Sequence, residues 1–332
     1  VTMGLLSLPS MLRAGYSPAL AAGTICATGT LGQIIPPSIA LVLLGDVIAS
    51  AYQRAQLDLG VVNTATVSVG DLFVGALIPG LILVAFYLLW ILLVARIRPQ
   101  LAPAIAAEGA SLPELFSALL PPFLLIPLVL GSILLGAATP TEAAGVGAVG
   151  ALLLALQGRQ MSWMKLHEIG LSTMRVTSMV FLILIGAAVF TFVLRGCGGE
   201  ELVQGFFNHM NLGPQGAMLL VMLIIFLLGF ILDFIEITFV VVPIVGPILL
   251  AMGIDPVWLG IMIALNLQTS FLTPPFGFAL FYLRGVAPSS VATSAIYRGV
   301  IPFIILQLLL MLTLWFWPEL ATWLPATLKT DS

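Results

Sequence analysis

The sequence predicts an all-α integral membrane protein, and three observations lead to this fold class. Of its 332 residues, 61% are hydrophobic and only 8% are charged, whereas soluble domains average about 45–50% and about 25%. Apolar stretches long enough to cross a bilayer recur along the chain. Two of them contain a Pro-Pro pair, which predicts discontinuous helices. The composition excludes a soluble enzyme and a disordered linker, and the net charge of −3 argues against a nucleic-acid binder.

The cysteine and histidine content argues against two further kinds of site. Cys26 and Cys197 are too few for a disulfide framework. His167 and His209 are too few for a metal-ligand cluster. The sequence therefore predicts neither a disulfide-stapled fold nor a site for a tightly ligated metal.

Hydropathy predicts which segments of the chain cross the membrane. The predicted spans cover residues 18–46, 70–95, 115–137, 141–157, 174–194, 257–283 and 299–317. A further apolar region, 216–252, is interrupted only by Asp233-Phe-Ile-Glu236, and each limb has about 17 residues, at the short edge of a span. A re-entrant helical hairpin fits this region better than two crossings. Polar connections are expected at 47–69, 96–114, 158–170, 195–215 and 284–298.

The distribution of basic residues predicts the orientation of the spans. Alternate connections hold Arg13, Arg96, Arg98, Arg159, Lys165, Arg175, Arg284 and Arg298 on one side, and Arg54, Arg195 and Lys329 on the other. Cytoplasmic loops carry the excess of Lys and Arg. The first set is therefore expected to face the cytoplasm, and the second set the periplasm of a bacterium.

An internal repeat is the most informative feature of the sequence. A shift of 238 residues superimposes Pro9, Gly15, Pro18, Pro36 and Pro37 on Pro247, Gly253, Pro256, Pro274 and Pro275. In both copies an N-cap residue precedes a proline at the first helical position, and a Pro-Pro pair follows. Four spans and a hairpin separate the copies, an even number of crossings, so the copies should run in opposite directions. Matching Pro/Gly-interrupted segments in inverted halves indicate the central site of a secondary transporter.

The two Pro-Pro segments cannot remain continuous α-helix at low cost. Each proline removes an N–H donor and costs about 3 kcal/mol inside a helix. Carbonyls freed in the bilayer must find partners in protein or around a cavity. A cation bound by carbonyl and hydroxyl oxygens, beside an anion at the half-helix N-terminus, would satisfy them. The alternative is a pair of kinked helices sealed by Ser and Thr side chains.

Other polar residues admit structural explanations. Asp233 and Glu236 have the spacing of a capping box, although an intramembrane carboxylate is also a candidate ion ligand. Thr139 and Glu142 form a second predicted capping box. The glycines that follow it are expected to serve close helix packing; they are Gly145, Gly147 and Gly150.

Four motifs resemble the large permease subunit of TRAP (tripartite ATP-independent periplasmic) transporters. They are Gly29-Thr-Leu-Gly-Gln-Ile-Ile-Pro-Pro-Ser38, Thr139-Pro-Thr-Glu-Ala-Ala144, Leu232-Asp-Phe-Ile-Glu-Ile-Thr238 and Asn266-Leu-Gln-Thr-Ser-Phe-Leu-Thr-Pro-Pro-Phe-Gly277. They occur in the family's order, and the similarity extends over essentially the whole chain. The last two resemble the branch labelled for mannitol or chloroaromatic compounds, beside the C4-dicarboxylate type, and this label says little about substrate.

The resemblance implies an elevator-type, Na⁺-coupled importer of organic acids and not an enzyme. Its ion sites would lie at two hairpin tips and the broken helix after each. The implied ion- and substrate-binding residues are Gly29, Thr30, Gly32, Pro36, Ser38, Gly229, Asp233, Asn266, Gln268, Thr269, Ser270, Thr273, Pro275 and Gly277. No cofactor is implied beyond Na⁺ as the coupling ion.

The resemblance also implies partners, location and domain organisation. The partners would be a small membrane subunit, a periplasmic substrate-binding protein and a carboxylate substrate, in the bacterial inner (cytoplasmic) membrane. Residues 1–332 would form one multi-pass domain. Its parts would be the end of the first repeat at 1–50, scaffold or connecting spans at 70–194, the second repeat at 216–284 and a last span at 299–320.

The start of the chain predicts a fragment of a longer protein. Residue 1 is Val, and the short apolar run 1–12 resembles the returning limb of a first hairpin whose tip would precede it. We expect that this chain alone does not transport.

Three alternatives remain open at this stage. The first is a related inverted-repeat carboxylate transporter that needs no binding protein. The second is a passive channel, which would conduct without a Na⁺ gradient. The third is an intramembrane protease, which would need a membrane Asp pair or a membrane Ser with His, whereas only Asp233 is deeply placed.

Overall fold

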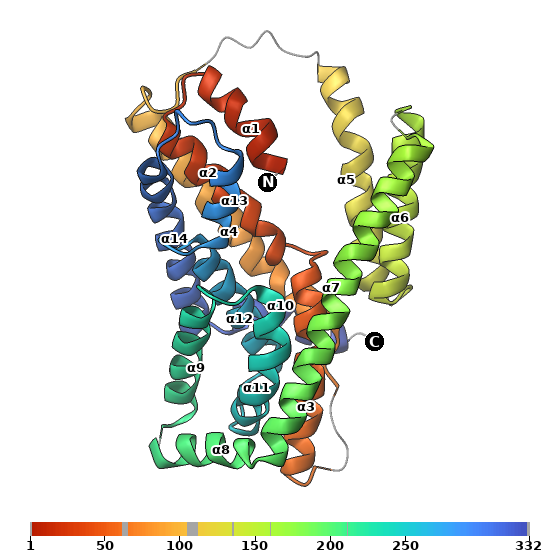
Figure 1. Ribbon diagram of the computed structural model, residues 1–332, viewed down its shortest axis with the longest axis vertical. Helices are drawn as coiled ribbons and strands as arrows, with labels where there is room; N and C mark the ends of the chain where they lie inside the picture. Colours follow the sequence, from red (N-terminus) through yellow and green to blue (C-terminus); the bar gives the residue numbers. More distant parts are fainter. Residues whose placement is uncertain are drawn as a thin grey trace. The chain divides into compact units, whose positions relative to one another are not determined.

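The computed structural model describes residues 2–61, 66–104, 112–134, 136–159, 161–210 and 212–330. About 81% of the chain is helical, and the described residues contain no β-strand. The helices of the first part are α1 (Thr2–Arg13), α2 (Pro18–Thr30), α3 (Ile39–Asp58), α4 (Val69–Ile97), α5 (Leu112–Leu134), α6 (Pro140–Gln157), α7 (Trp163–Gly196) and α8 (Gly199–Met210). The later helices are α9 (Pro214–Leu228), α10 (Phe234–Glu236), α11 (Val242–Ala251), α12 (Pro256–Leu272), α13 (Phe278–Val286), α14 (Thr293–Phe316) and α15 (Glu319–Thr330) (Figure 1).

Several helices have the length and apolarity of membrane spans. Among the described residues they are Val69–Ile97, Pro140–Gln157, Trp163–Leu194, Phe234–Ala251 and Thr293–Phe316. α9 and α12 are apolar but shorter. The expectation of an all-α integral membrane protein is confirmed.

The helices extend beyond the apolar segments that predicted them. α3 continues to Asp58, α7 begins at Trp163, and α8 lies within the expected polar connection 195–215. The reason is that hydropathy measures solubility in lipid, whereas residues such as Ala, Gln, Glu and Leu favour helix in any surrounding.

By internal packing the chain divides into two units. One comprises Val1–Ala106 with Glu200–Ser332, and the other comprises Ala107–Gly199. In the second unit α6 packs on α5 at two of the three glycines noted in the sequence. A Cβ on Gly150 would lie 2.4 Å from the Leu125 side chain, and one on Gly147 would lie 3.2 Å from Val129, whereas Gly145 has nothing within 4 Å.

The internal repeat is present in the first unit. Ser17 and Asp255 cap α2 and α12 by accepting hydrogen bonds from backbone N–H groups three residues on, and Pro18 and Pro256 occupy the first turns. Gly15 and Gly253, each just before a cap, have φ of +84° and +88°, a conformation that glycine adopts at little cost.

The two copies run in opposite directions. The chain descends from α2 to α3 and ascends from α12 to α13 (Figure 1). Copies with the same internal order but opposite direction form an inverted repeat. The two broken helices therefore run antiparallel to each other, and their breaks are approached from opposite ends of the first unit.

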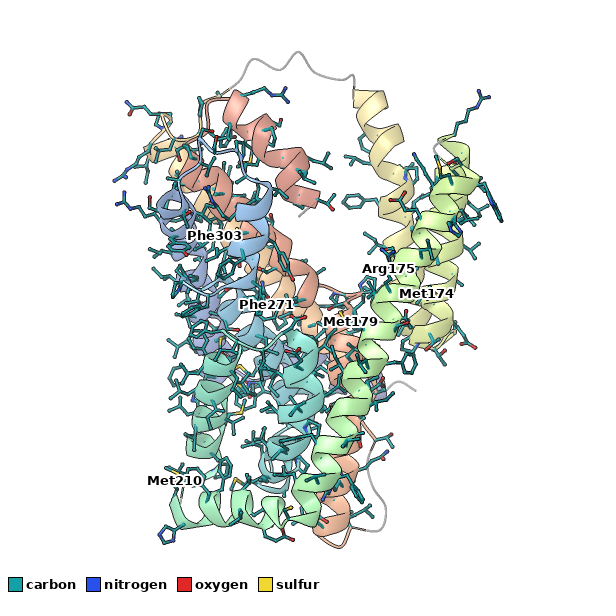
Figure 2. The ribbon with its side chains drawn as sticks, viewed as in Figure 1. Met174, Arg175, Met179, Met210, Phe271 and Phe303 are labelled. Atoms are coloured by element: carbon teal, nitrogen blue, oxygen red, sulfur yellow. The ribbon has the colours of Figure 1, made fainter. Side chains whose placement is uncertain are left out.

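The core of the first unit is centred on α12. Nearly every residue of α12 is buried, including Phe271, and Phe303 of α14 is fully buried as well (Figure 2). α2 approaches α14 so closely that a Cβ on Gly23 would lie 2.0 Å from the Gly299 carbonyl oxygen. The broken helices are thus embedded in protein, as freed backbone in a bilayer requires.

Candidate functional site

The first broken helix is interrupted between α2 and α3. α2 ends at Thr30 and continues as one 3₁₀ turn, Leu31–Gln33. Ser38 then begins α3, and its hydroxyl donates to the Gln33 carbonyl (2.7 Å) while accepting from the Leu41 N–H (3.3 Å). One serine side chain therefore satisfies polar groups on both sides of the break.

The second break separates α12 from α13. The Thr273 N–H donates to the Ser270 carbonyl (3.1 Å), and the Gly277 N–H donates to the Thr273 carbonyl (3.0 Å). The Pro275 carbonyl accepts from the Tyr297 hydroxyl (3.3 Å). The Pro36–Pro37 and Pro274–Pro275 peptide bonds are both cis.

Gly277 is required by close packing at the second break. A Cβ at this position would lie 2.5 Å from the Phe271 carbonyl oxygen, far inside contact distance. The chain can return to begin α13 at Phe278 because no side chain occupies this space.

The tip of the hairpin lies between α9 and α10. The Asp233 N–H donates to Glu236 Oε2 (2.8 Å), and Asp233 Oδ1 accepts from the Phe234 N–H (2.8 Å). The capping-box interpretation of this pair is confirmed. A cap uses one carboxylate oxygen of Asp233 and does not prevent the other from binding an ion.

The hairpin packs on the second broken helix at three places. A Cβ on Gly229 would lie 2.2 Å from Ser270 Oγ. The Phe230 and Phe276 rings lie 6.3 Å apart. Asn266 Nδ2 donates to the carbonyl of Met222 in α9 (2.7 Å).

One cavity of about 420 Å³ joins both breaks and the hairpin tip. Its residues come from the start of α1, the α2 side of the first break, Asp233 at the tip, and both sides of the second break. They are Thr2, Met3, Gly4, Ile25, Cys26, Gly29, Thr30, Gln33, Asp233, Phe271, Phe278, Ala279, Tyr282 and Leu283. Segments more than 200 residues apart in the sequence therefore line a single space.

The charged and polar side chains of the lining determine which ions the cavity could hold. Of the described residues that line it, Asp233 is the one acidic residue, and none is Lys, Arg or His. Gln33 Oε1 is buried without a hydrogen-bond partner. An anion in this cavity would have to be held by backbone N–H groups, hydroxyls or a bound cation, whereas a cation would find oxygen atoms.

The hydroxyl groups near the breaks have their oxygens available. Each donates its proton to a carbonyl in the preceding turn, at 2.7–2.9 Å. These residues are Thr30, Thr269, Ser270 and Thr273. A hydroxyl that donates to a carbonyl keeps its lone pairs, so each oxygen could also bind a cation such as Na⁺, although Thr30 Oγ1 also accepts from Gln268 Nε2 (3.4 Å).

Three of the residues expected from the sequence line the cavity: Gly29, Thr30 and Asp233. The others build the breaks and the hairpin contact, or lie beside them. They are Gly32, Pro36, Ser38, Gly229, Asn266, Gln268, Thr269, Ser270, Thr273, Pro275 and Gly277. Sequence reasoning missed Gln33, Cys26, Phe271, Phe278 and Tyr282 as lining residues. Gln33 and Phe271 could have been found because they lie inside the quoted motifs.

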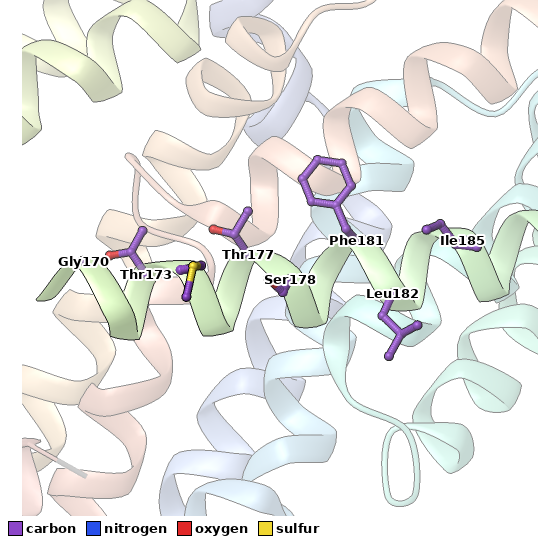
Figure 3. A pocket seen from close by; sticks show the side chains of 8 residues that line it. Gly170, Thr173, Thr177, Ser178, Phe181, Leu182 and Ile185 are labelled. Carbon is purple, nitrogen blue, oxygen red and sulfur yellow. The ribbon is translucent and has the colours of Figure 1, made fainter. Parts of the chain in front are cut away.

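A second hollow, of about 700 Å³, is lined by residues of α7 alone. Thr173, Thr177 and Phe181 project from one side of this helix (Figure 3). One helix cannot enclose a ligand, so this hollow is a surface of α7. Among the described residues, no three His, Cys, Asp or Glu side chains gather as a metal-binding group.

Comparison with known proteins assigns a family. Residues 1–320 match the model of the DctM component of the tripartite ATP-independent periplasmic transporter. The C4-dicarboxylate TRAP transporter large permease protein DctM of Pseudomonas aeruginosa is 31% identical over 97% of this chain and 71% of its own length. The sialic acid TRAP transporter large permease protein SiaM of Vibrio cholerae is 28% identical over 97% and 71%. The ectoine/5-hydroxyectoine TRAP transporter large permease protein UehC of Ruegeria pomeroyi is 27% identical over 95% and 69%.

Proposed function

This chain belongs to the DctM component family of TRAP transporters, and from this premise we propose that it is the membrane subunit of a Na⁺-coupled importer of organic acids. The relatives it matches are transporter permease subunits, and the chain is a multi-pass membrane protein; we propose that it has no enzymatic role. The Na⁺ coupling, the acid substrate, the two partner proteins and the inner-membrane location are likewise proposed.

The cavity shared by both breaks is the observation that carries the proposal. It joins the two inverted broken helices and the hairpin tip, which is where alternating-access transporters hold their cargo. Among the lining residues, Asp233, Gln33 and Thr30 have side-chain oxygen atoms that could serve as ligands. Sodium prefers such hard oxygen ligands to nitrogen or sulfur.

The proposed mechanism assigns the anion to the half-helix N-termini. α3 begins at Ile39 and α13 begins at Phe278, each directly after a break. The first N–H groups of a helix and its dipole attract negative charge. With Na⁺ bound beside them, the positive potential rises, and a carboxylate binds without a basic side chain.

The two broken helices and the hairpin, with Na⁺ and the anion bound, would then move across the bilayer. Release on the inner side would follow this movement. Once Na⁺ leaves toward the lower concentration inside, the anion loses its partner charge and leaves with it. The two species therefore cross together, which defines a symporter.

The partners follow from the family. A periplasmic substrate-binding protein would deliver the acid, and a small membrane subunit would complete the scaffold. Relatives named for C4-dicarboxylate, sialic acid and ectoine have a common permease family but different substrates. We therefore propose that the identity of the acid depends largely on the binding protein.

Uptake into proteoliposomes tests this function. The permease is reconstituted with its small subunit, and the loaded binding protein is added outside under an imposed Na⁺ gradient. We expect uptake against the acid's own gradient that stops when K⁺ replaces Na⁺. Uptake without the binding protein would indicate a binding-protein-independent transporter, and downhill flux indifferent to Na⁺ would indicate a channel. Either result contradicts the proposal.

A further inference from the structure

Two side-chain hydrogen bonds connect the two broken helices in the part of the chain that the structure describes. Cys26 Sγ in α2 donates to the Ala279 carbonyl in α13 (3.7 Å), and Gln268 Nε2 in α12 donates to Thr30 Oγ1 at the end of α2 (3.4 Å). Gln268 and Thr30 are separated by 238 positions, which is the offset of the internal repeat. Each is therefore the counterpart of the other, and the bond crosses the axis that relates the two inverted copies.

Both partners are buried, in positions next to the breaks. Gln268 is fully buried and Thr30 is 6% exposed. Thr30 lines the cavity and also donates to the Ala27 carbonyl. Gln268 lies in the last turns of α12, ahead of the break at Thr273. A displacement of either helix end therefore changes this contact directly.

The contact holds the Gln268 side chain by one end only. Its Oε1 is buried and has no hydrogen-bond partner, and a buried polar atom without a partner is costly. The N···O distance of 3.4 Å exceeds the usual 2.7–3.2 Å range for this kind of bond. The contact can therefore shorten, and strengthen, when the two helix ends approach.

We propose that Gln268 is a positioning residue that couples the two breaks, so that occupancy of one site raises the affinity of the other. Ligands bound at one break draw its helix end toward the cavity, shorten the Thr30–Gln268 bond and pre-form the second site. This inference rests on the proposed function, because it requires ions or substrate at the breaks. A coupling of this kind is reciprocal between the two sites.

A Na⁺ titration followed by thermal unfolding tests the coupling on the full chain. For the unchanged protein we expect a Hill coefficient above one. In Gln268→Met the Hill coefficient should fall toward one, and the half-saturating Na⁺ concentration should rise about three- to tenfold, the effect of losing one buried hydrogen bond. Gln307→Met is the matched control. Gln307 is also fully buried, donates to the Tyr87 hydroxyl (2.8 Å) and has a buried Oε1 without a partner among the described residues, but its partner lies in α4 and in neither broken helix.

A second pair of variants, at Thr30, tests the coupling even if Gln268→Met does not fold. Thr30→Val keeps the shape and removes Oγ1, which is both the acceptor for Gln268 and a proposed Na⁺ ligand, whereas Thr30→Ser keeps the hydroxyl. Because loss of a ligand alone would weaken Na⁺ binding, the coupling is measured by the effect of Gln268→Met in the Thr30→Val background. We expect Thr30→Val to lose cooperativity and Thr30→Ser to retain it, and the Gln268→Met effect on the Hill coefficient to vanish in the Thr30→Val background.

Two results would overturn the coupling. If the unchanged protein binds Na⁺ cooperatively and Gln268→Met or Thr30→Val keeps the same Hill coefficient, the coupling is refuted and the proposed function stands. If the unchanged protein shows no response to Na⁺ at all, both the coupling and the proposed ion dependence fail.

Discussion

Gly229 is the position where the smallest substitution should have a large, traceable effect. In Gly229→Ala the new Cβ would lie 2.2 Å from Ser270 Oγ and 2.9 Å from Ser270 Cβ. Ordinary van der Waals contacts begin at about 3.4 Å, so the hairpin tip must move away from the second break. Overpacking of this kind costs about 1–3 kcal/mol, and we expect the free energy of unfolding to fall by this amount.

The two nearest obstructing atoms belong to one side chain, which allows a double-mutant cycle. Ser270→Gly removes both of them and leaves only the Ile225 carbonyl oxygen, 3.3 Å from the new Cβ, at its own cost of about 1 kcal/mol for glycine inside a helix. We expect the two changes together to cost about 1–2 kcal/mol less than their sum. Thermal or denaturant unfolding in Na⁺-free buffer measures this, so that loss of an ion ligand at Ser270 does not contribute. If the two costs simply add, Gly229 does not pack on Ser270 and this account of the hairpin is wrong.

Three further predictions concern packing, charge and partners. Gly23→Ala should destabilise the chain by about 2 kcal/mol or more, because its Cβ would meet the backbone carbonyl of Gly299 at 2.0 Å; an unchanged unfolding temperature would contradict the α2–α14 contact. Asp233→Asn should preserve the helix cap, because Asn is an equally good N-cap residue. The same change should raise the half-saturating Na⁺ concentration in a binding titration, and an unaltered Na⁺ affinity would limit Asp233 to its capping role. The chain reconstituted without partner proteins should show no Na⁺-driven uptake in liposomes, and measurable uptake would remove the need for them.

The features predicted from the sequence were those with local causes. A proline pair interrupts a helix. Ser17 and Asp255 predict where a helix begins, because their side chains can accept a hydrogen bond from the first turn. The breaks, the caps and the inverted repeat therefore followed from residue types and spacing. The capping box at Asp233 was predicted for the same reason.

The composition of the cavity could not be predicted in this way. Cys26 and Tyr282 lie in apolar helical segments with no signal of their own, and they line the cavity because α2 and α13 pack together. The resemblance paired Asp233 with the second break, and the structure places Asp233 in a cavity lined by residues of that break, Phe271 and Phe278, and also by Gly29 of the first break. Such juxtapositions depend on tertiary packing, which a linear pattern does not encode. The expected polar connection at 195–215 contains the helix α8, Gly199–Met210, because a polar segment can still have residues that favour a helix.

A comparison of Na⁺ with K⁺ in thermal unfolding tests whether the two broken helices bind Na⁺ through backbone and hydroxyl oxygens. Binding at a hundred times the dissociation constant stabilises a fold by about 2.7 kcal/mol. We expect a saturable rise in unfolding temperature with Na⁺ but not with K⁺, and its loss in Thr273→Val. Thr313→Val is the matched control, because Thr313 makes the same bond to a carbonyl four residues back (2.8 Å, against 2.7 Å for Thr273) in α14. Equal shifts with both cations, or a Na⁺ shift that survives in Thr273→Val, would contradict the account.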